Sequence, residues 1–159
     1  MNNNNHIQHE PAFEVIGIAI RTTNQAAMEQ GTIGMLWQQF FVESIYAAIP
    51  NKVDHALVAV YYDFEDGKKG EYNLLIGARV SSLDDIPAGM MAVHVPEQKR
   101  MVFISKVGLR SEIVFELWQE IWHLEDQGAL NRAYTADYEV YDERSQDPQH
   151  AQIEIHIGL

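Results

Sequence analysis

The feature that most constrains the fold of this chain is an internal duplication. The segment LWQQFF at residues 36–41 resembles LWQEIW at residues 117–122, and the two are 81 residues apart. The dipeptide Tyr62-Asp63 resembles Tyr141-Asp142 at the similar separation of 79 residues. Two nearly equal offsets between elements in the same order indicate a repeated unit. The alternative is a chance similarity between two amphipathic helices.

The first repeat is predicted to span about residues 13–82 and to have the order β-α-β-β. Alternating Ile and Val residues predict the first strand, and apolar residues at helical spacing predict a helix that ends at IPNK. Pro50 cannot continue the helical hydrogen bonds. The turn EDGKKGE joins the last two strands into an antiparallel hairpin. The predicted ranges are a strand at 14–22, a helix at 26–49, and strands at 55–64 and 72–81.

The second repeat is predicted to span about residues 89–159 with the same pattern. Its helix has apolar residues along one stripe, and Gly128 fits the position that follows a helix. The predicted ranges are strands at 90–95 and 100–106, a helix at 112–127, and strands at 134–142 and 151–157.

The fold class predicted from this duplication is α+β. The strands of the two repeats form one antiparallel sheet, and the two helices lie on one face. A cleft between helices and sheet is expected where the repeats meet, and ligand pockets favour such junctions. Residues 13–159 are therefore predicted to form a single domain, with residues 1–12 as a flexible N-terminal tail.

The charge balance limits the classes of partner. The chain has 11 Lys and Arg against 23 Asp and Glu, a net charge of −12. Such a surface would repel nucleic acid, so direct DNA binding is not expected, whereas cationic ligands would be attracted. The alternative is that the acidity serves only solubility. No apolar run approaches the roughly 20 residues of a membrane span. There is no cysteine, and the N-terminus does not resemble a secretory signal, so a cytoplasmic location without membrane association is expected.

The strand in ADYEVYDE contains an acid where an apolar residue is expected. Side chains alternate along a strand, so Asp137, Glu139 and Tyr141 point to one face. The Tyr-Asp alignment places Glu139 at the position of Val60 in the first repeat. The alternative is a shift of register by one residue, which would place Glu139 in solvent.

An inward-facing Glu139 would need a positive partner. An ionised carboxylate in an apolar pocket is costly unless it is paired, and no Lys or Arg is evident on the adjacent segments. A cationic ligand could supply the charge, and aromatic walls would add roughly 0.5–2 kcal/mol per favourable ring. The candidate ligand-binding residues are Glu139, Trp37, Phe40, Tyr46, Trp118, Trp122 and Tyr141.

These motifs resemble a known family. YEVYDE followed by IEIHIG, and preceded by VGLRSEIVFELWQEIW, resembles the gyrase-inhibitor-like effector-binding domains of AraC-type and MerR-type regulators. The segments RTTNQAAM, GTIGMLW, IPNKVD and IPAGM are most similar to the stand-alone integron-associated effector-binding proteins. The resemblance covers nearly the whole chain after about residue 12.

The resemblance implies a binding function. Members of this family bind lipophilic cationic drugs in a pocket between the repeats, and their essential acid lies in the strand that matches YEVYDE, which implies this role for Glu139. No helix-turn-helix segment is evident in this chain. A response at DNA would therefore require a DNA-binding protein partner, and a homo-oligomer is the other expected assembly.

Two other functions are compatible with the sequence. The seven histidines show no HExxH-like pairing, so no metal or cofactor is expected, and His94 and His123 are weak candidates for haem ligands. Some relatives are hydrolases of reactive electrophiles. In such an enzyme Glu139 would be the general base and Tyr141 a hydrogen-bond donor. A non-enzymatic binding protein is the preferred interpretation.

Overall fold

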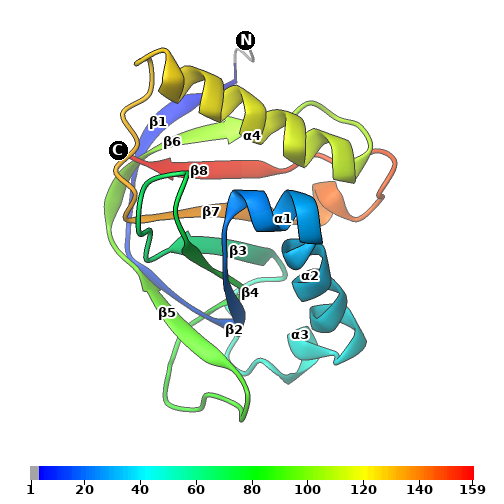
Figure 1. Ribbon diagram of the computed structural model, residues 1–159. Helices are drawn as coiled ribbons and strands as arrows, with labels where there is room; N and C mark the ends of the chain where they lie inside the picture. Colours follow the sequence, from blue (N-terminus) through cyan, green and yellow to red (C-terminus); the bar gives the residue numbers. More distant parts are fainter. Residues whose placement is uncertain (1–3) are drawn as a thin grey trace.

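The computed structural model describes residues 4–159, which form one eight-stranded antiparallel sheet with helices over one of its faces (Figure 1). The first part of the chain contains β1 (His6–Glu10), β2 (Phe13–Thr22), α1 (Asn24–Gln30), α2 (Thr32–Val42), α3 (Ile45–Ala48), β3 (Leu57–Tyr62) and β4 (Tyr72–Val80). The second part contains β5 (Met91–Val95), β6 (Gln98–Ile104), α4 (Arg110–Asp126), β7 (Ala136–Tyr141), a short 3₁₀ turn (Glu143–Ser145) and β8 (Glu154–Gly158). The predicted α+β class is confirmed.

The strand order confirms the duplicated topology. The order β1-β6-β8-β7-β3-β4-β2-β5 consists of two halves with matching arrangements that meet where β7 pairs with β3. The unit β6-α4-β7-β8 repeats the unit formed by β2, α1–α3, β3 and β4. The repeats therefore lie side by side about a pseudo-twofold axis between β3 and β7, and one continuous sheet buries the junction.

The outer strands β1 and β5 are exchanged between the halves. β1 precedes β2 but pairs with β6, and β5 precedes β6 but pairs with β2. The pairing of residues 6–10 with 98–102 continues in the same register, past Pro11 and Pro96, as the pairing of 13–17 with 91–95. Our expectation of a flexible tail at residues 1–12 was wrong for residues 6–10. The polar sequence HIQHE resembles a solvated tail, but its backbone completes the sheet edge and Glu10 is buried.

The sheet is buried on both faces. One cluster joins the helices to strand residues such as Ala59, Tyr61, Ile76 and Ile155. The other cluster lies on the opposite face and includes Val58, Val60, Leu75, Tyr138 and Val140. The alignment of Glu139 with Val60 was therefore wrong by one residue, because Val60 faces away from the helices.

Ala59 is the structural counterpart of Glu139. The two residues pair directly across β3 and β7, and both lie on the helix-facing side of the sheet. By the same relation Tyr61 corresponds to Tyr141. The acid thus lies beside the pseudo-twofold axis, opposite a small apolar residue.

The two repeats differ in their helices. The single helix predicted at 26–49 is divided into α1, α2 and α3. Gly31 (φ 67°) and Ser44 (φ 52°) have left-handed backbone conformations, which interrupt the helical hydrogen bonds. In the second repeat, α4 continues without a break for 17 residues.

Candidate functional site

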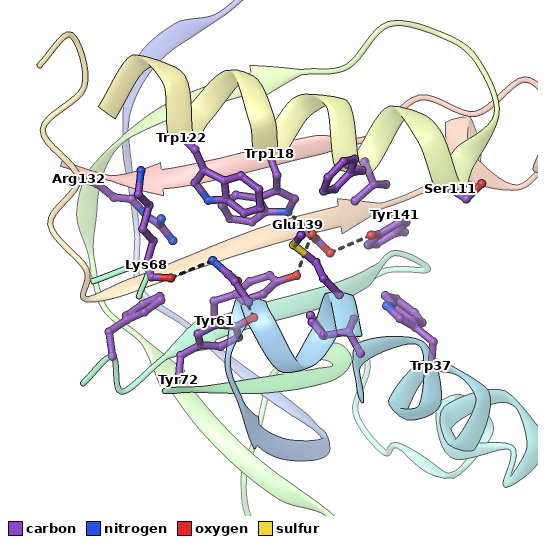
Figure 2. Close-up of a pocket in the computed structure, with 17 residues that line it drawn as sticks. Trp37, Tyr61, Lys68, Tyr72, Ser111, Trp118, Trp122, Arg132, Glu139 and Tyr141 are labelled. Carbon is purple, nitrogen blue, oxygen red and sulfur yellow. Dashed lines mark hydrogen bonds between the residues drawn. The ribbon is translucent and has the colours of Figure 1, made fainter. Parts of the chain in front are cut away.

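A cavity lies between the helices and the centre of the sheet, where the repeats meet. It encloses about 870 Å³ including its open mouth. Helices α1, α2 and α4 provide its walls, and β3, β4 and β7 provide its floor (Figure 2). The lining residues are Asn24, Ala27, Met28, Ile33, Trp37, Tyr61, Phe64, Lys68, Tyr72, Ser111, Val114, Phe115, Trp118, Trp122, Arg132, Glu139 and Tyr141.

Glu139 lies at the centre of this cavity with only 2% of its surface exposed. Trp118 Nε1 donates a hydrogen bond to its Oε2 atom at 2.6 Å, and the Tyr61 hydroxyl donates to the same oxygen at 3.0 Å. The Tyr141 hydroxyl donates to Oε1 at 2.8 Å (Figure 2). Three neutral donors from α4, β3 and β7 thus orient one carboxylate.

The protonation of Glu139 reflects these surroundings. Burial raises the pKa of its carboxyl group above the usual range, and the hydrogen bonds from Trp118, Tyr141 and Tyr61 offset this only in part. Burial and the adjacent carboxylate also raise the pKa values of Tyr61 and Tyr141 well above normal. Both phenols therefore remain protonated donors at neutral pH.

Within residues 4–159, no Lys, Arg or His forms an ion pair with Glu139. Two basic residues do line the cavity. Arg132 Nε pairs with Asp137 Oδ2 at 2.8 Å, and Lys68 pairs with Asp126. Both lie at the end of the cavity opposite Trp37 (Figure 2). Because these other carboxylates compensate both charges, neither Arg132 nor Lys68 compensates the charge of Glu139.

Aromatic side chains surround the carboxylate in a nearly symmetrical arrangement. Trp37 meets Tyr141 edge to face, with ring centroids 5.0 Å apart and planes at 72°. Trp118 meets Tyr61 in the same way, at 5.2 Å and 67°. The duplication relates these two pairs, and each joins a helix of one repeat to a strand of the other. Trp122 extends the wall by stacking on Trp118 at 6.0 Å.

Five of the seven predicted site residues line the cavity, namely Glu139, Trp37, Trp118, Trp122 and Tyr141. The other two do not. Phe40 is 1% exposed and packs in the core behind Trp37. Tyr46 follows the helix break at Ser44 and lies under the Lys52 ammonium, 4.8 Å from its ring centroid. The prediction assumed one continuous helix, and the break turns Tyr46 away.

Sequence reasoning missed Tyr61, Phe64, Tyr72, Lys68 and Arg132. The one-residue error in aligning the repeats concealed Tyr61, which is the counterpart of Tyr141. Lys68 and Arg132 lie in connecting segments whose position depends on tertiary packing, and no spacing in the sequence indicates them.

The histidine candidates lie elsewhere. His94 is exposed and pairs with Glu14, and His123 is exposed near the end of α4. Neither lines the cavity. In the part of the chain that the structure describes, no group of three or more His, Asp or Glu side chains could hold a metal ion. No helix among residues 4–159 is both long and apolar enough to span a bilayer.

Known proteins are similar over nearly the whole chain. The family model described as integron-associated effector binding protein matches residues 6–159. The Bacillus subtilis protein YobU, named as a candidate transcriptional regulator, is 30% identical over 156 residues, which cover 97% of this chain and 96% of YobU.

Two solved structures also match. The integron cassette protein VCH_CASS2 of Vibrio cholerae has 27% identity and a TM-score of 0.76, with 98% of this chain and 95% of that chain covered. SAV2435, solved with bound tetraphenylphosphonium, has 20% identity and a TM-score of 0.78, with 98% and 93% covered. With the fold, the aromatic cavity and this family match together, the chain belongs to the integron-associated effector-binding family.

Proposed function

We propose that this protein binds lipophilic organic cations in the central cavity, with Glu139 as the counter-charge. One observation carries the proposal: a carboxylate that is 2% exposed accepts three neutral hydrogen bonds and has no ion pair among residues 4–159. A monovalent cation in the cavity would remove this imbalance. At an effective dielectric constant of about 20, two opposite charges roughly 4 Å apart attract by about 4 kcal/mol.

The aromatic walls favour a broad, weakly hydrated cation. Trp37, Trp118 and Tyr141 present ring surfaces beside the carboxylate, and each favourable ring contributes about 0.5–2 kcal/mol to a bound cation. Ligands with aryl groups would bury apolar area against these walls at about 25 cal/mol per Å².

A relative supports the ligand class. SAV2435 was solved with tetraphenylphosphonium, a bulky monocation with four phenyl rings. At 20% identity this comparison establishes a shared fold. The buried carboxylate and the aromatic walls of this chain give an independent physical reason to expect the same kind of ligand.

The proposal includes regulation through another protein. YobU, which matches along nearly its full length, is named as a candidate transcriptional regulator. Because the net charge of −12 disfavours direct DNA binding, a ligand signal would pass through a DNA-binding partner or a homo-oligomer. This route would be supported if a DNA-binding protein co-purified with this chain and ligand either released it or promoted its association.

A hydrolase is the alternative that the geometry supports less well. A general base must receive a proton from water or substrate, but two donors already occupy Oε2 and a third occupies Oε1. The same three bonds suit a carboxylate that remains charged beside a cation.

A thermal-shift experiment tests the proposal. Tetraphenylphosphonium at a hundredfold excess over its Kd should stabilise the fold by about 2.7 kcal/mol. Triphenylphosphine oxide, which has similar phenyl groups and no net charge, should stabilise it far less. Equal stabilisation by both compounds would contradict the role of the carboxylate.

A further inference from the structure

A second cavity lies beyond the Trp37–Tyr141 pair, between α2 and the first turns of α4. Its lining residues are Ile33, Gly34, Trp37, Phe41, Leu57, Arg110, Ser111, Val114, Tyr141 and Ser145. Five of these residues also line the central cavity, so the two cavities are neighbours that share a wall. Figure 2 shows Trp37, Tyr141 and Ser111 at this end of the central cavity.

The walls of the second cavity suit a flat aromatic group. Trp37 and Phe41 both line this cavity, and their nearly parallel rings stack with centroids 5.9 Å apart and planes at 21°. Leu57 and Val114 add aliphatic surface. Phe41 keeps 61% of its surface exposed, so its ring is accessible to a ligand.

Arg110 is the polar group that distinguishes this cavity. Its Nη1 atom donates to the Ser145 carbonyl at 2.8 Å, which is a neutral acceptor. Within residues 4–159, it is the one arginine that forms no ion pair with a carboxylate. The other arginines all have such partners, namely Arg21, Arg79, Arg100, Arg132 and Arg144.

The two neighbouring cavities therefore have opposite uncompensated charges. Among residues 4–159, Glu139 has no ion pair in the central cavity, where Lys68 and Arg132 are paired with other carboxylates, and no Asp or Glu lines the second cavity beside Arg110. A guanidinium has five N–H donors, and the Ser145 carbonyl uses only one of them. A planar carboxylate could accept two parallel bonds from the remaining donors.

We propose that the second cavity binds an aromatic carboxylate, with its anionic group on Arg110 and its ring against Trp37 and Phe41. The carboxylate could belong to a separate anion or to the far end of a zwitterion whose cationic end lies beside Glu139. Only the zwitterionic source rests on the proposed cation site. The net charge of −12 slows the approach of anions, but at physiological salt it is screened beyond about 8 Å.

Calorimetric titration with 1-naphthoate at physiological salt tests this site. The wild-type protein should bind 1-naphthoate and should bind the neutral 1-naphthamide at least about tenfold more weakly. Arg110→Gln should weaken naphthoate binding by at least about tenfold, which corresponds to about 1.4 kcal/mol, and should leave naphthamide binding unchanged.

Lys106→Gln is the matched control. It removes the same unit of charge near the start of α4, but Lys106 is exposed and pairs with Glu116 outside the cavity. Naphthoate affinity should be unaffected. Equal losses for Arg110→Gln and Lys106→Gln, or no naphthoate binding by folded wild-type protein, would overturn the proposal.

Two further arms separate the possible sources and the two sites. Glu139→Gln should retain naphthoate binding, and Arg110→Gln should retain tetraphenylphosphonium binding. Failure of one site would then be distinguishable from failure of the other. A naphthoate with a flexible trimethylammonium arm should bind at least about tenfold more tightly than naphthoate if one zwitterion spans both cavities. Equal affinities would assign the site to a separate anion.

Discussion

Glu10 and Glu139 are both buried glutamates, yet their surroundings move their pKa values in opposite directions. Glu10 is 6% exposed and Glu139 is 2% exposed. Burial alone would raise the pKa of Glu10, but bonds from His156 at 2.5 Å and Tyr138 at 2.6 Å lower it to about 2. Around Glu139 the donors are all neutral, and the pKa stays raised.

The charged partners distinguish an acid that stabilises the fold from an acid that is available to a ligand. Glu10 accepts from a histidine whose own pKa is raised, against the effect of burial, by Glu10 and Glu154. The Arg100 guanidinium lies 3.5 Å away as a second cation. This cluster ties β1 to β6, β7 and β8, so its charges serve the fold. Glu139 forms no ion pair with any described residue, which leaves its charge available to a ligand.

Removal of the charge on Glu10 should cost the most stability. Glu10→Gln leaves His156 and Arg100 without their buried partner, and breaking such a pair costs roughly 3–5 kcal/mol. Chemical denaturation at pH 7 measures the loss. Glu97→Gln, whose partner His9 is as exposed as Glu97 itself, should change stability by less than about 1 kcal/mol. Similar values for both variants would place Glu10 among ordinary surface acids.

The pH dependence of stability should differ in sign for the two acids. The pKa of Glu139 is raised in the folded state. Its contribution to the free energy of unfolding is therefore complete below the pKa of the unfolded chain, about 4.5, and is lost as pH rises. Glu139→Gln should therefore match the wild type at pH 4 and exceed it at pH 8. Glu10 contributes above about 4.5, and this contribution is lost as pH falls towards 2.

Unfolding free energies of the wild type and both variants from pH 3 to pH 8 test these signs. The comparison uses differences between variant and wild type, so the other titrating groups cancel. A Glu139→Gln variant that loses stability relative to the wild type as pH rises would contradict the raised pKa.

The tryptophans related by the duplication should behave unequally. Trp118→Phe removes the shorter of the two hydrogen bonds to Glu139 Oε2, so the carboxylate becomes harder to ionise and cation affinity should fall about tenfold at pH 7. Part of this loss should be recovered at pH 8.5, where the carboxylate is more ionised. Trp37→Phe keeps all three hydrogen bonds and should cost about threefold or less. Calorimetry with tetraphenylphosphonium measures both, and equal, pH-independent losses would mean that only ring area matters.

The two tyrosines should have smaller effects than Trp118. Tyr141 donates to Oε1, whereas Tyr61 shares Oε2 with Trp118. Tyr141→Phe should thus weaken cation binding by about fivefold and Tyr61→Phe by about 2.5-fold, because a typical hydrogen bond contributes a net stabilisation of about 0.5–1.5 kcal/mol. If Tyr61→Phe weakened binding more than Tyr141→Phe in calorimetric titrations, the sharing of Oε2 by two donors would not determine the size of the loss.

Much of the fold could be predicted from the sequence because the duplication and alternation are local signals. Alternation along β7 was sufficient to place Glu139 and Tyr141 on one face of the strand. The errors arose where tertiary structure decides. The polar strand β1 is stabilised by pairing with β6, which is about 90 residues away in the chain. Gly31 and Ser44 redirect the helix and remove Tyr46 from the site.

The cation-binding role of Glu139 remains a proposal, as does the role of each ring around it. The sequence predicted an acid among aromatic residues but not the hydrogen bonds that keep it oriented. Tyr61 comes from the other repeat, and its contact with Glu139 depends on the pairing of β3 with β7. This hydrogen bond forms only when the two repeats are assembled into one sheet, so no local sequence pattern indicates it.

The role of Glu139 as the counter-charge is tested by calorimetric affinities of wild-type protein and Glu139→Gln for tetraphenylphosphonium and for triphenylphosphine oxide. The wild type should favour the cation by at least about a hundredfold, or roughly 2.7 kcal/mol, and this preference should disappear in the variant while affinity for the neutral compound stays the same. A preference for the cation that survives in a folded Glu139→Gln protein would contradict the claim.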